Sequence, residues 1–176
     1  LLQPEGGRIA NTSSGAASSY VAGAMMGNPM GVATAAQKKP LVKSDVTWAQ
    51  IEAVVDIERE GGFTRDASKQ QAGWCAYGLS KAALTAYAML LARTYPQFVV
   101  SSCSPGFINT KMTAGWGAKL APEDGTKSLR HCLFSELGGP GWYFGSDGLR
   151  SPLHVMRNPG DPAYDGYPAE PGEPAW

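Results

Sequence analysis

Residues 75–84 read CAYGLSKAAL, and this stretch decides how the middle of the chain folds. Its Ala and Leu residues are strong helix formers, so the stretch predicts a helix. Side chains four positions apart share one face of a helix, which puts the phenol of Tyr77 beside the ammonium of Lys81. Such a pair can exchange a proton with a bound molecule, provided that neighbouring elements bring a reacting group to it.

Strand and helix patterns alternate on both sides of this helix. The helix itself is expected to run to about Arg93, because a proline follows at position 96. The other expected elements are a strand within residues 7–15, a helix at 44–60, a strand at 98–103, a helix at 122–136 and a strand at 142–144. This order is typical of an α/β fold: a parallel sheet with helices on both faces.

Two further segments complete the expected organisation. Residues 1–150 form the α/β domain, and a helical insertion occupies about residues 16–72. From residue 151 to residue 176, Pro, Gly and Asp dominate, which predicts an irregular C-terminal tail. The first residue is not Met, and a strand-like run begins within the first ten residues. We therefore expect this sequence to be the C-terminal part of a longer protein.

Composition excludes several classes of partner. The 176 residues are 43% hydrophobic, with 15 basic and 15 acidic side chains, so no net charge attracts nucleic acid or an anionic membrane. The longest apolar runs fall short of the roughly 18 residues that span a bilayer, and we expect no export signal. Three widely spaced cysteines favour reduced thiols over a disulfide frame or a zinc site. We expect a cytoplasmic protein without a metal.

Three chemistry-bearing features follow the expected strands in order. Ser14 comes at the end of the first strand, Tyr77 and Lys81 lie on the helix after the insertion, and Pro105-Gly106 follows the next strand. The carboxyl ends of parallel strands meet along one edge of the sheet, where ligands bind. The sequence therefore predicts one site at this edge.

These motifs resemble the C-terminal part of the short-chain dehydrogenase/reductase family. The matching residues are the Asn-Thr-Ser-Ser-Gly run at 11–15, the Tyr-x-x-x-Lys of Tyr77 and Lys81, and the Pro-Gly-Phe-Ile-Asn-Thr run at 105–110. Ser14 and Tyr77 are 63 positions apart, which is far more than usual in the family and is similar to its carbonyl reductases. The resemblance implies a doubly wound, Rossmann-type sheet and, when the protein is complete, a monomer whose insertion covers the surface that relatives use to oligomerise.

The resemblance also implies a reaction and a cofactor. By that likeness the protein reduces a ketone or an aldehyde with NADP as cofactor, NAD being the alternative because the residues that select between them are absent from this chain. Tyr77 is the expected general acid, Lys81 lowers its pKa and holds the nicotinamide ribose, and Ser14 orients the carbonyl. The expected cofactor-binding residues are Tyr77, Lys81, Pro105, Gly106, Ile108 and Thr110.

Some alternatives stay open in the sequence. Ser13 competes with Ser14 for the role of the site serine. The Gly-rich segment 23–31 contains a proline and follows no clear strand, so we favour a place in the insertion over a phosphate loop. Because the family's Gly-rich nucleotide loop is absent, the chain can also be a non-catalytic fragment or an interaction module. The sequence does not specify the substrate beyond a small carbonyl compound.

Overall fold

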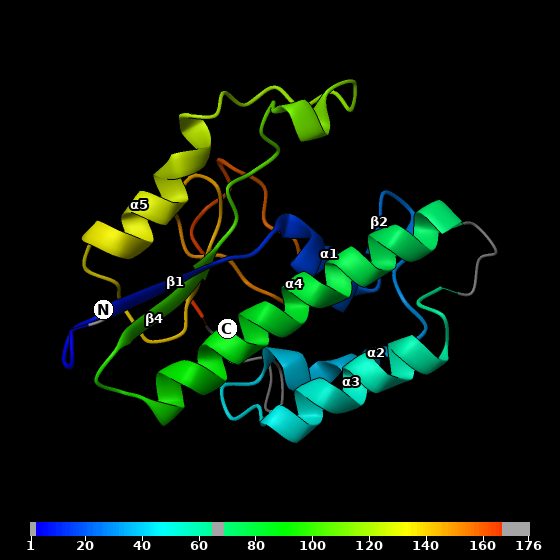
Figure 1. Ribbon diagram of the computed structural model, residues 1–176, viewed down its shortest axis with the longest axis horizontal. Helices are drawn as coiled ribbons and strands as arrows, with labels where there is room; N and C mark the ends of the chain where they lie inside the picture. The colour runs from blue at the N-terminus through cyan, green and yellow to red at the C-terminus, as the bar shows by residue number, and fades with distance from the viewer. Residues whose placement is uncertain (1–2, 65–68, 167–176) are drawn as a thin grey trace.

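A parallel three-stranded sheet organises the molecule. The computed structural model describes residues 3–64 and 69–166. Strand β1 (Arg8–Thr12) pairs with β4 (Val99–Cys103), and β4 pairs with β5 (Tyr143–Phe144), in the order β1-β4-β5. Figure 1 shows helix α5 (Lys127–Phe134) on one side of the strands and helix α4 (Lys69–Thr94) on the other. The expected α/β fold with a parallel sheet and helices on both faces is confirmed.

Helix α4 is the central element of the core. It packs against helix α1 (Gly15–Ala22), which starts directly after β1 and which the sequence did not predict. A Cβ atom at Gly78 would lie 2.7 Å from the Met30 side chain and 3.1 Å from the carbonyl oxygen of Ala16, so the two helices approach closely. Many of the α4 side chains buried in this core are alanines.

By length and composition alone, residues 70–94 of α4 could also cross a membrane, a candidate that counting uninterrupted apolar runs did not reveal. In the structure, however, α4 packs against α1, α3 and β4. These contacts identify α4 as the core helix of a folded domain.

The region between α1 and α4 is folded throughout its described part. Its elements are β2 (Ala24–Met25), β3 (Asn28–Pro29), α2 (Ala35–Lys38), the 3-10 helix η1 (Lys39–Val42) and α3 (Trp48–Glu60). The predicted helix at 44–60 is confirmed as α3, which begins later because the Thr47 hydroxyl caps it. Strands β2 and β3 form an antiparallel hairpin within residues 23–31, which is not the strand–turn–helix arrangement of a phosphate loop.

A buried polar cluster fixes this region to the core. The carboxylate of Glu58 accepts hydrogen bonds from the Tyr20 hydroxyl at 2.7 Å and from the backbone N–H groups of Val32 and Ala33 at 2.9 Å. The buried Lys38 ammonium donates to the carbonyl oxygens of Tyr20 and Met30. Burial lowers the pKa of Lys38, and burial together with the Glu58 hydrogen bond raises the pKa of Tyr20. Backbone and side-chain partners thus satisfy the Glu58 carboxylate and the Lys38 ammonium.

The helix predicted at residues 122–136 is shorter than expected. A 3-10 helix, η3 (Asp124–Thr126), precedes α5, which starts at Lys127. A Cβ atom at Gly125 would lie 2.0 Å from Ile108 Cδ1, so this part of the chain is pressed against the loop that follows β4. Residues 124–126 therefore form a 3-10 helix against this loop, where the sequence predicted the first turns of an α-helix.

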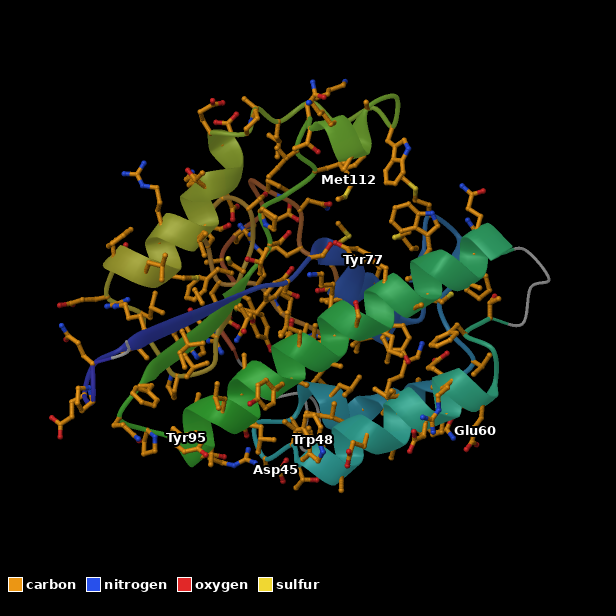
Figure 2. The ribbon with its side chains drawn as sticks, in the orientation of Figure 1. Asp45, Trp48, Glu60, Tyr77, Tyr95 and Met112 are labelled. Carbon is orange, nitrogen blue, oxygen red and sulfur yellow. The ribbon has the colours of Figure 1, made fainter. Side chains whose placement is uncertain are left out.

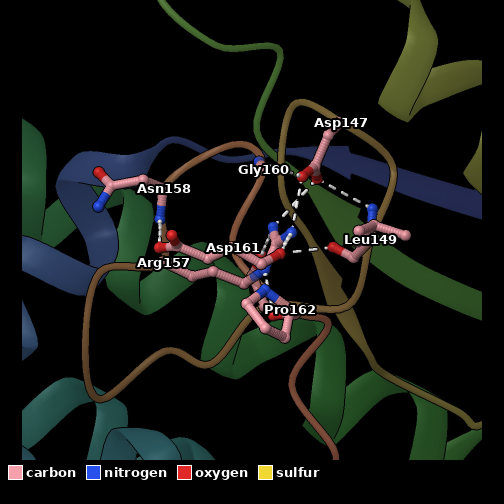
Figure 3. A network of polar contacts seen from close by, with 8 residues as sticks. Asp147, Leu149, Arg157, Asn158, Gly160, Asp161 and Pro162 are labelled. Carbon is pink, nitrogen blue, oxygen red and sulfur yellow. Dashed lines mark hydrogen bonds and ion pairs between the residues drawn. The ribbon is translucent and has the colours of Figure 1, made fainter.

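Residues 145–166, the described part of the segment after β5, contain no helix or strand, yet they are packed. Leu153 is fully buried in the main core. Figure 3 shows the contacts around Arg157, whose guanidinium pairs with the Asp147 carboxylate through two hydrogen bonds of 3.0 and 2.6 Å. Arg157 also donates to the carbonyl oxygens of Asp161 and Pro162. This pair closes residues 147–162 into a loop that lies on the core. Residues 167–176 of the expected tail lie outside the described residues.

Candidate active site

Tyr77 and Lys81 lie on one face of α4, as their spacing predicts. The Lys81 ammonium nitrogen is 5.8 Å from the centre of the Tyr77 ring. The same nitrogen donates a hydrogen bond of 2.9 Å to the carbonyl oxygen of Thr12, the last residue of β1. The Tyr77 residue is 41% exposed, so part of it is open to a bound molecule. The hydrogen bond from Lys81 to Thr12 holds this part of α4 at the carboxyl end of the sheet.

The two candidate serines differ in their surroundings. Ser13 is buried, and its hydroxyl is 2.7 Å from the hydroxyl of Thr85 and 3.2 Å from the carbonyl oxygen of Lys81. Ser14 is half-buried and caps α1, where its side-chain oxygen accepts a hydrogen bond from the N–H of Ala16 at 3.2 Å. A capping serine uses its oxygen as the acceptor, which leaves its O–H free to donate to a ligand. The geometry therefore favours Ser14 over Ser13 as the hydroxyl available to a substrate.

The loop after β4 carries the remaining candidates. Gly106 has a φ of +88°, and a Cβ atom there would lie 2.7 Å from Leu120 and 2.9 Å from Ser146, so both conformation and space require glycine. The N–H of Asn109 donates to the carbonyl oxygen of Leu120 at 2.8 Å and closes the loop at its base.

Ile108 and Thr110 lie at the start of this closed loop. The Ile108 carbonyl oxygen accepts from the Thr113 hydroxyl at 2.5 Å, and that hydroxyl lies 3.2 Å from the hydroxyl of Thr110. The side chain of Thr110 is exposed beside these groups. Pro105, Ile108 and Thr110 thus follow a strand whose carboxyl end lies beside that of β1.

A second tyrosine lies near the site and was not predicted. Burial raises the pKa of Tyr143 on β5, proximity to Tyr77 adds to the rise, and hydrogen bonds with Ser104 and Ser18 oppose it. Tyr143 therefore remains a neutral phenol next to Tyr77. The sequence indicates only that Tyr143 begins a short strand, and this does not reveal that Tyr77 lies near it.

Two tryptophans near Tyr77 were also missed. The Trp74 ring meets the Tyr77 ring edge-on, with centroids 6.2 Å apart, and lies 5.9 Å from the ring of Trp116. Figure 2 shows Tyr77 on α4 facing the loop that carries Met112. The spacing of three residues between Trp74 and Tyr77 was a usable signal, whereas nothing local links Trp116 to α4.

The described residues provide no group of side chains that could bind a metal ion. Within residues 3–64 and 69–166, no three His, Cys, Asp or Glu side chains gather to hold a metal ion. The three cysteines are free and buried. The available groups are a phenol, an ammonium, hydroxyls and backbone amides, which suit a polar organic ligand and proton transfer.

Comparison with known proteins finds several dehydrogenases and reductases that are similar to this chain. Salutaridine reductase of Papaver bracteatum is 37% identical over 76 residues, covering 41% of this chain and 24% of that protein. The (+)-neomenthol dehydrogenase of Capsicum annuum is 35% identical over 81 residues, covering 44% of this chain and 26% of that protein. Short-chain dehydrogenase/reductase 1 of Saponaria officinalis is 36% identical over 76 residues, covering 41% of this chain and 25% of that protein. This chain thus spans about a quarter of the length of the curated relatives it matches.

The fold is similar over a longer stretch. The solved structure of salutaridine reductase from Papaver somniferum superimposes with a TM-score of 0.59 at 26% identity, covering 79% of this chain and 45% of that one. No protein-family model matches the sequence.

Proposed function

Because the chain is homologous to the C-terminal portion of short-chain dehydrogenases/reductases, we propose that it carries the catalytic residues of an NADPH-dependent carbonyl reductase. The reaction would convert a ketone or an aldehyde into an alcohol. The observation that carries this proposal is the row of Tyr77 and Lys81 on α4, joined to the end of β1 by the Lys81–Thr12 hydrogen bond.

In the proposed reaction, Tyr77 donates its hydroxyl proton to the carbonyl oxygen of the substrate. The ammonium of Lys81 stabilises the negative charge that develops on the Tyr77 oxygen. The Ser14 O–H donates a hydrogen bond to the same carbonyl oxygen and holds it in line with the phenol. General acid catalysis by a positioned side chain accelerates such reactions by a factor on the order of 10² to 10⁴.

The residues around the pair fit a nicotinamide cofactor. Of the three N–H donors of Lys81, one is used by the Thr12 carbonyl, which leaves two for the hydroxyls of a ribose. The exposed hydroxyl of Thr110 and the backbone of Pro105, Gly106 and Ile108 would hold the nicotinamide end. When bound, the cofactor supplies the hydride that reaches the carbonyl carbon.

A turnover assay tests this proposal. The chain is mixed with NADPH and acetophenone, and the absorbance of the reduced cofactor is followed. We expect a steady loss of absorbance that falls at least about 100-fold in Tyr77→Phe, because phenylalanine keeps the ring but has no proton to donate. Tyr95→Phe is the matched control, since Tyr95 is 45% exposed on the turn after α4, and its rate should equal that of the wild type.

The alternative function is a non-catalytic interaction module. Within the described residues, β1 pairs only with β4, so its other edge presents backbone groups that can take a further strand. Absence of turnover and of NADPH binding in this chain, with both present in a longer polypeptide that adds a Gly-rich strand–turn–helix upstream, would favour the module. Failure of the longer polypeptide to bind nucleotide would overturn the reductase proposal.

A further inference from the structure

We propose that Trp74 and Trp116 form the specificity subsite for the substrate and select a flat, uncharged ring attached to the carbonyl. The inference rests on the proposed function, since it takes Tyr77 as the group that meets the carbonyl oxygen. It concerns two side chains that this function leaves without a role.

The first argument is the order of residues along α4. Trp74, Tyr77 and Lys81 are three and four positions apart, so they form a row on one face of the helix. Lys81, at one end of the row, bonds to Thr12 on the sheet. Trp74, at the other end, lies against Tyr77 in a T-shaped arrangement of the two rings. A molecule that reaches the phenol from the side opposite Lys81 therefore passes the indole of Trp74.

The second argument is the loop that carries Trp116. Its base is closed by the Asn109–Leu120 hydrogen bond, and the N–H of Trp116 donates to the carbonyl oxygen of Thr113 at 3.0 Å. Gly115 and Gly117 flank the tryptophan with φ values of +80° and +82°, which is a conformation that glycine adopts without strain. The chain thus turns sharply on both sides of Trp116 and presents its indole to Trp74, although Trp116 lies 22 positions after Thr94, the last residue of α4.

The third argument is the unused aromatic surface. The planes of Trp74 and Trp116 are inclined by 59°, so the two indoles are not stacked face to face. Trp116 remains 57% exposed and Tyr77 41% exposed. Aromatic rings gain from offset or edge-to-face contacts with further rings, beyond the gain from burial alone. An aromatic ring of the substrate would complete this arrangement, whereas a puckered saturated ring would gain only the burial.

Charge distinguishes a neutral ring from a cationic ligand. Aromatic clusters also bind ammonium groups, but here the Lys81 ammonium is already 5.8 Å from the centre of the Tyr77 ring. The charged residues of the loop at 107–120 are Lys111 and Lys119, and the loop has no acid. A second cation would add to the positive charge of Lys81 and of this loop, so the subsite fits an uncharged ring.

The test uses two pairs of ligands that differ only in the ring. Acetophenone and cyclohexyl methyl ketone are compared by kcat/KM with NADPH. Their product alcohols, 1-phenylethanol and 1-cyclohexylethanol, are titrated without cofactor while the indole N–H resonances of the tryptophans are followed by NMR. The alcohol titration does not need turnover, so it reports on the subsite even if the proposed reaction fails.

We expect Trp116→Ala to lower kcat/KM for acetophenone, and the affinity for 1-phenylethanol, by roughly tenfold. The values for the cyclohexyl compounds should change less than twofold, and Trp116→Phe should restore most of the loss. Trp48→Ala is the matched control, because Trp48 is 53% exposed on α3 and pairs with Tyr87. Figure 2 shows Trp48 far from the loop that faces Tyr77.

The possible outcomes separate the two proposals. Turnover with equal losses for both ring types in Trp116→Ala, or with no loss, overturns the subsite and leaves the reductase function standing. Ring-selective shifts of the Trp74 and Trp116 resonances without turnover support the subsite and refute the function of this chain. Absence of both turnover and ring-selective shifts overturns the subsite, and the longer polypeptide then decides the reductase proposal.

Discussion

The ion pair between Asp147 and Arg157 gives the sharpest prediction for stability. Burial by itself raises the pKa of Asp147, but hydrogen bonds from Arg157, from the N–H groups of Leu149 and Gly160, and the charge of Arg157 lower it from 3.8 to about 2. The side chains are 16% and 5% exposed, so solvent screens the pair only weakly. Each tenfold change in proton affinity corresponds to about 1.4 kcal/mol, so the ionised carboxylate contributes about 2 kcal/mol to folding at pH 7.

The dependence on pH follows from the direction of that pKa. Because the pKa is lower in the folded state, the contribution is fully present above pH 4 and is lost as the pH falls toward 2. Asp147→Asn removes the charge at every pH. We therefore expect the variant to be about 2 kcal/mol less stable than the wild type at pH 7, and the difference to narrow by about 1 kcal/mol at pH 3.

Urea unfolding followed by circular dichroism at pH 7, 5 and 3 measures these differences. Asp56→Asn is the control, since Asp56 and Arg59 form an ion pair whose side chains are 53% and 68% exposed on α3. Exposed pairs contribute about 0–1 kcal/mol, so this variant should change little. A difference for Asp147→Asn that stays constant from pH 7 to pH 3, or that equals the difference for Asp56→Asn, would refute the role given to the buried pair.

Two further predictions concern the contact between α1 and α4 and the buried cluster around Glu58. Gly78→Ala should lower the free energy of unfolding by about 1–3 kcal/mol, because its Cβ would crowd Met30 and the backbone of α1. Gly73→Ala is the control and should not destabilise the protein, since the space around Gly73 is open. Thermal unfolding compares the two variants. Glu58→Gln replaces one acceptor oxygen by a donor and leaves a buried N–H or O–H unsatisfied, so we expect a loss of about 1–3 kcal/mol in urea unfolding, and Glu52→Gln on the exposed side of α3 should lose almost nothing. Equal stability of either variant and its control would contradict the contacts described here.

The strands and the longest helices could be predicted because their signals are local. The strand predicted at 98–103 is confirmed as β4. It could be predicted because β-branched residues there are followed by a proline that ends the run. Helix α1 was missed because Gly15 and the small residues after it show no periodic apolar pattern. What stabilises α1 is its close packing on α4, together with the Ser14 cap, and only the cap is visible in the sequence.

The candidate site divides in the same way. The spacing of Tyr77 and Lys81 predicts that they share a helix face, and the structure has them there. The choice between Ser13 and Ser14 required knowing which hydroxyl faces the core, because neighbouring residues point to opposite sides at the end of a strand. The contact between Trp74 and Trp116 depends on the path of a loop, which neither periodicity nor composition encodes.

The cap of α1 restricts which amino acids position 14 can accept. Ser, Thr, Asp and Asn all cap helices well, so folding alone would tolerate any of the four. Among them only Ser and Thr have a hydroxyl that can accept from the Ala16 N–H and still donate to a carbonyl oxygen. A library that randomises this codon should thus retain Ser, Thr, Asp, Asn and also Gly when it is selected for folding. Under the proposed reaction it should retain only Ser and Thr when it is selected for reduction, so the residues that survive at this one codon distinguish a structural from a catalytic demand.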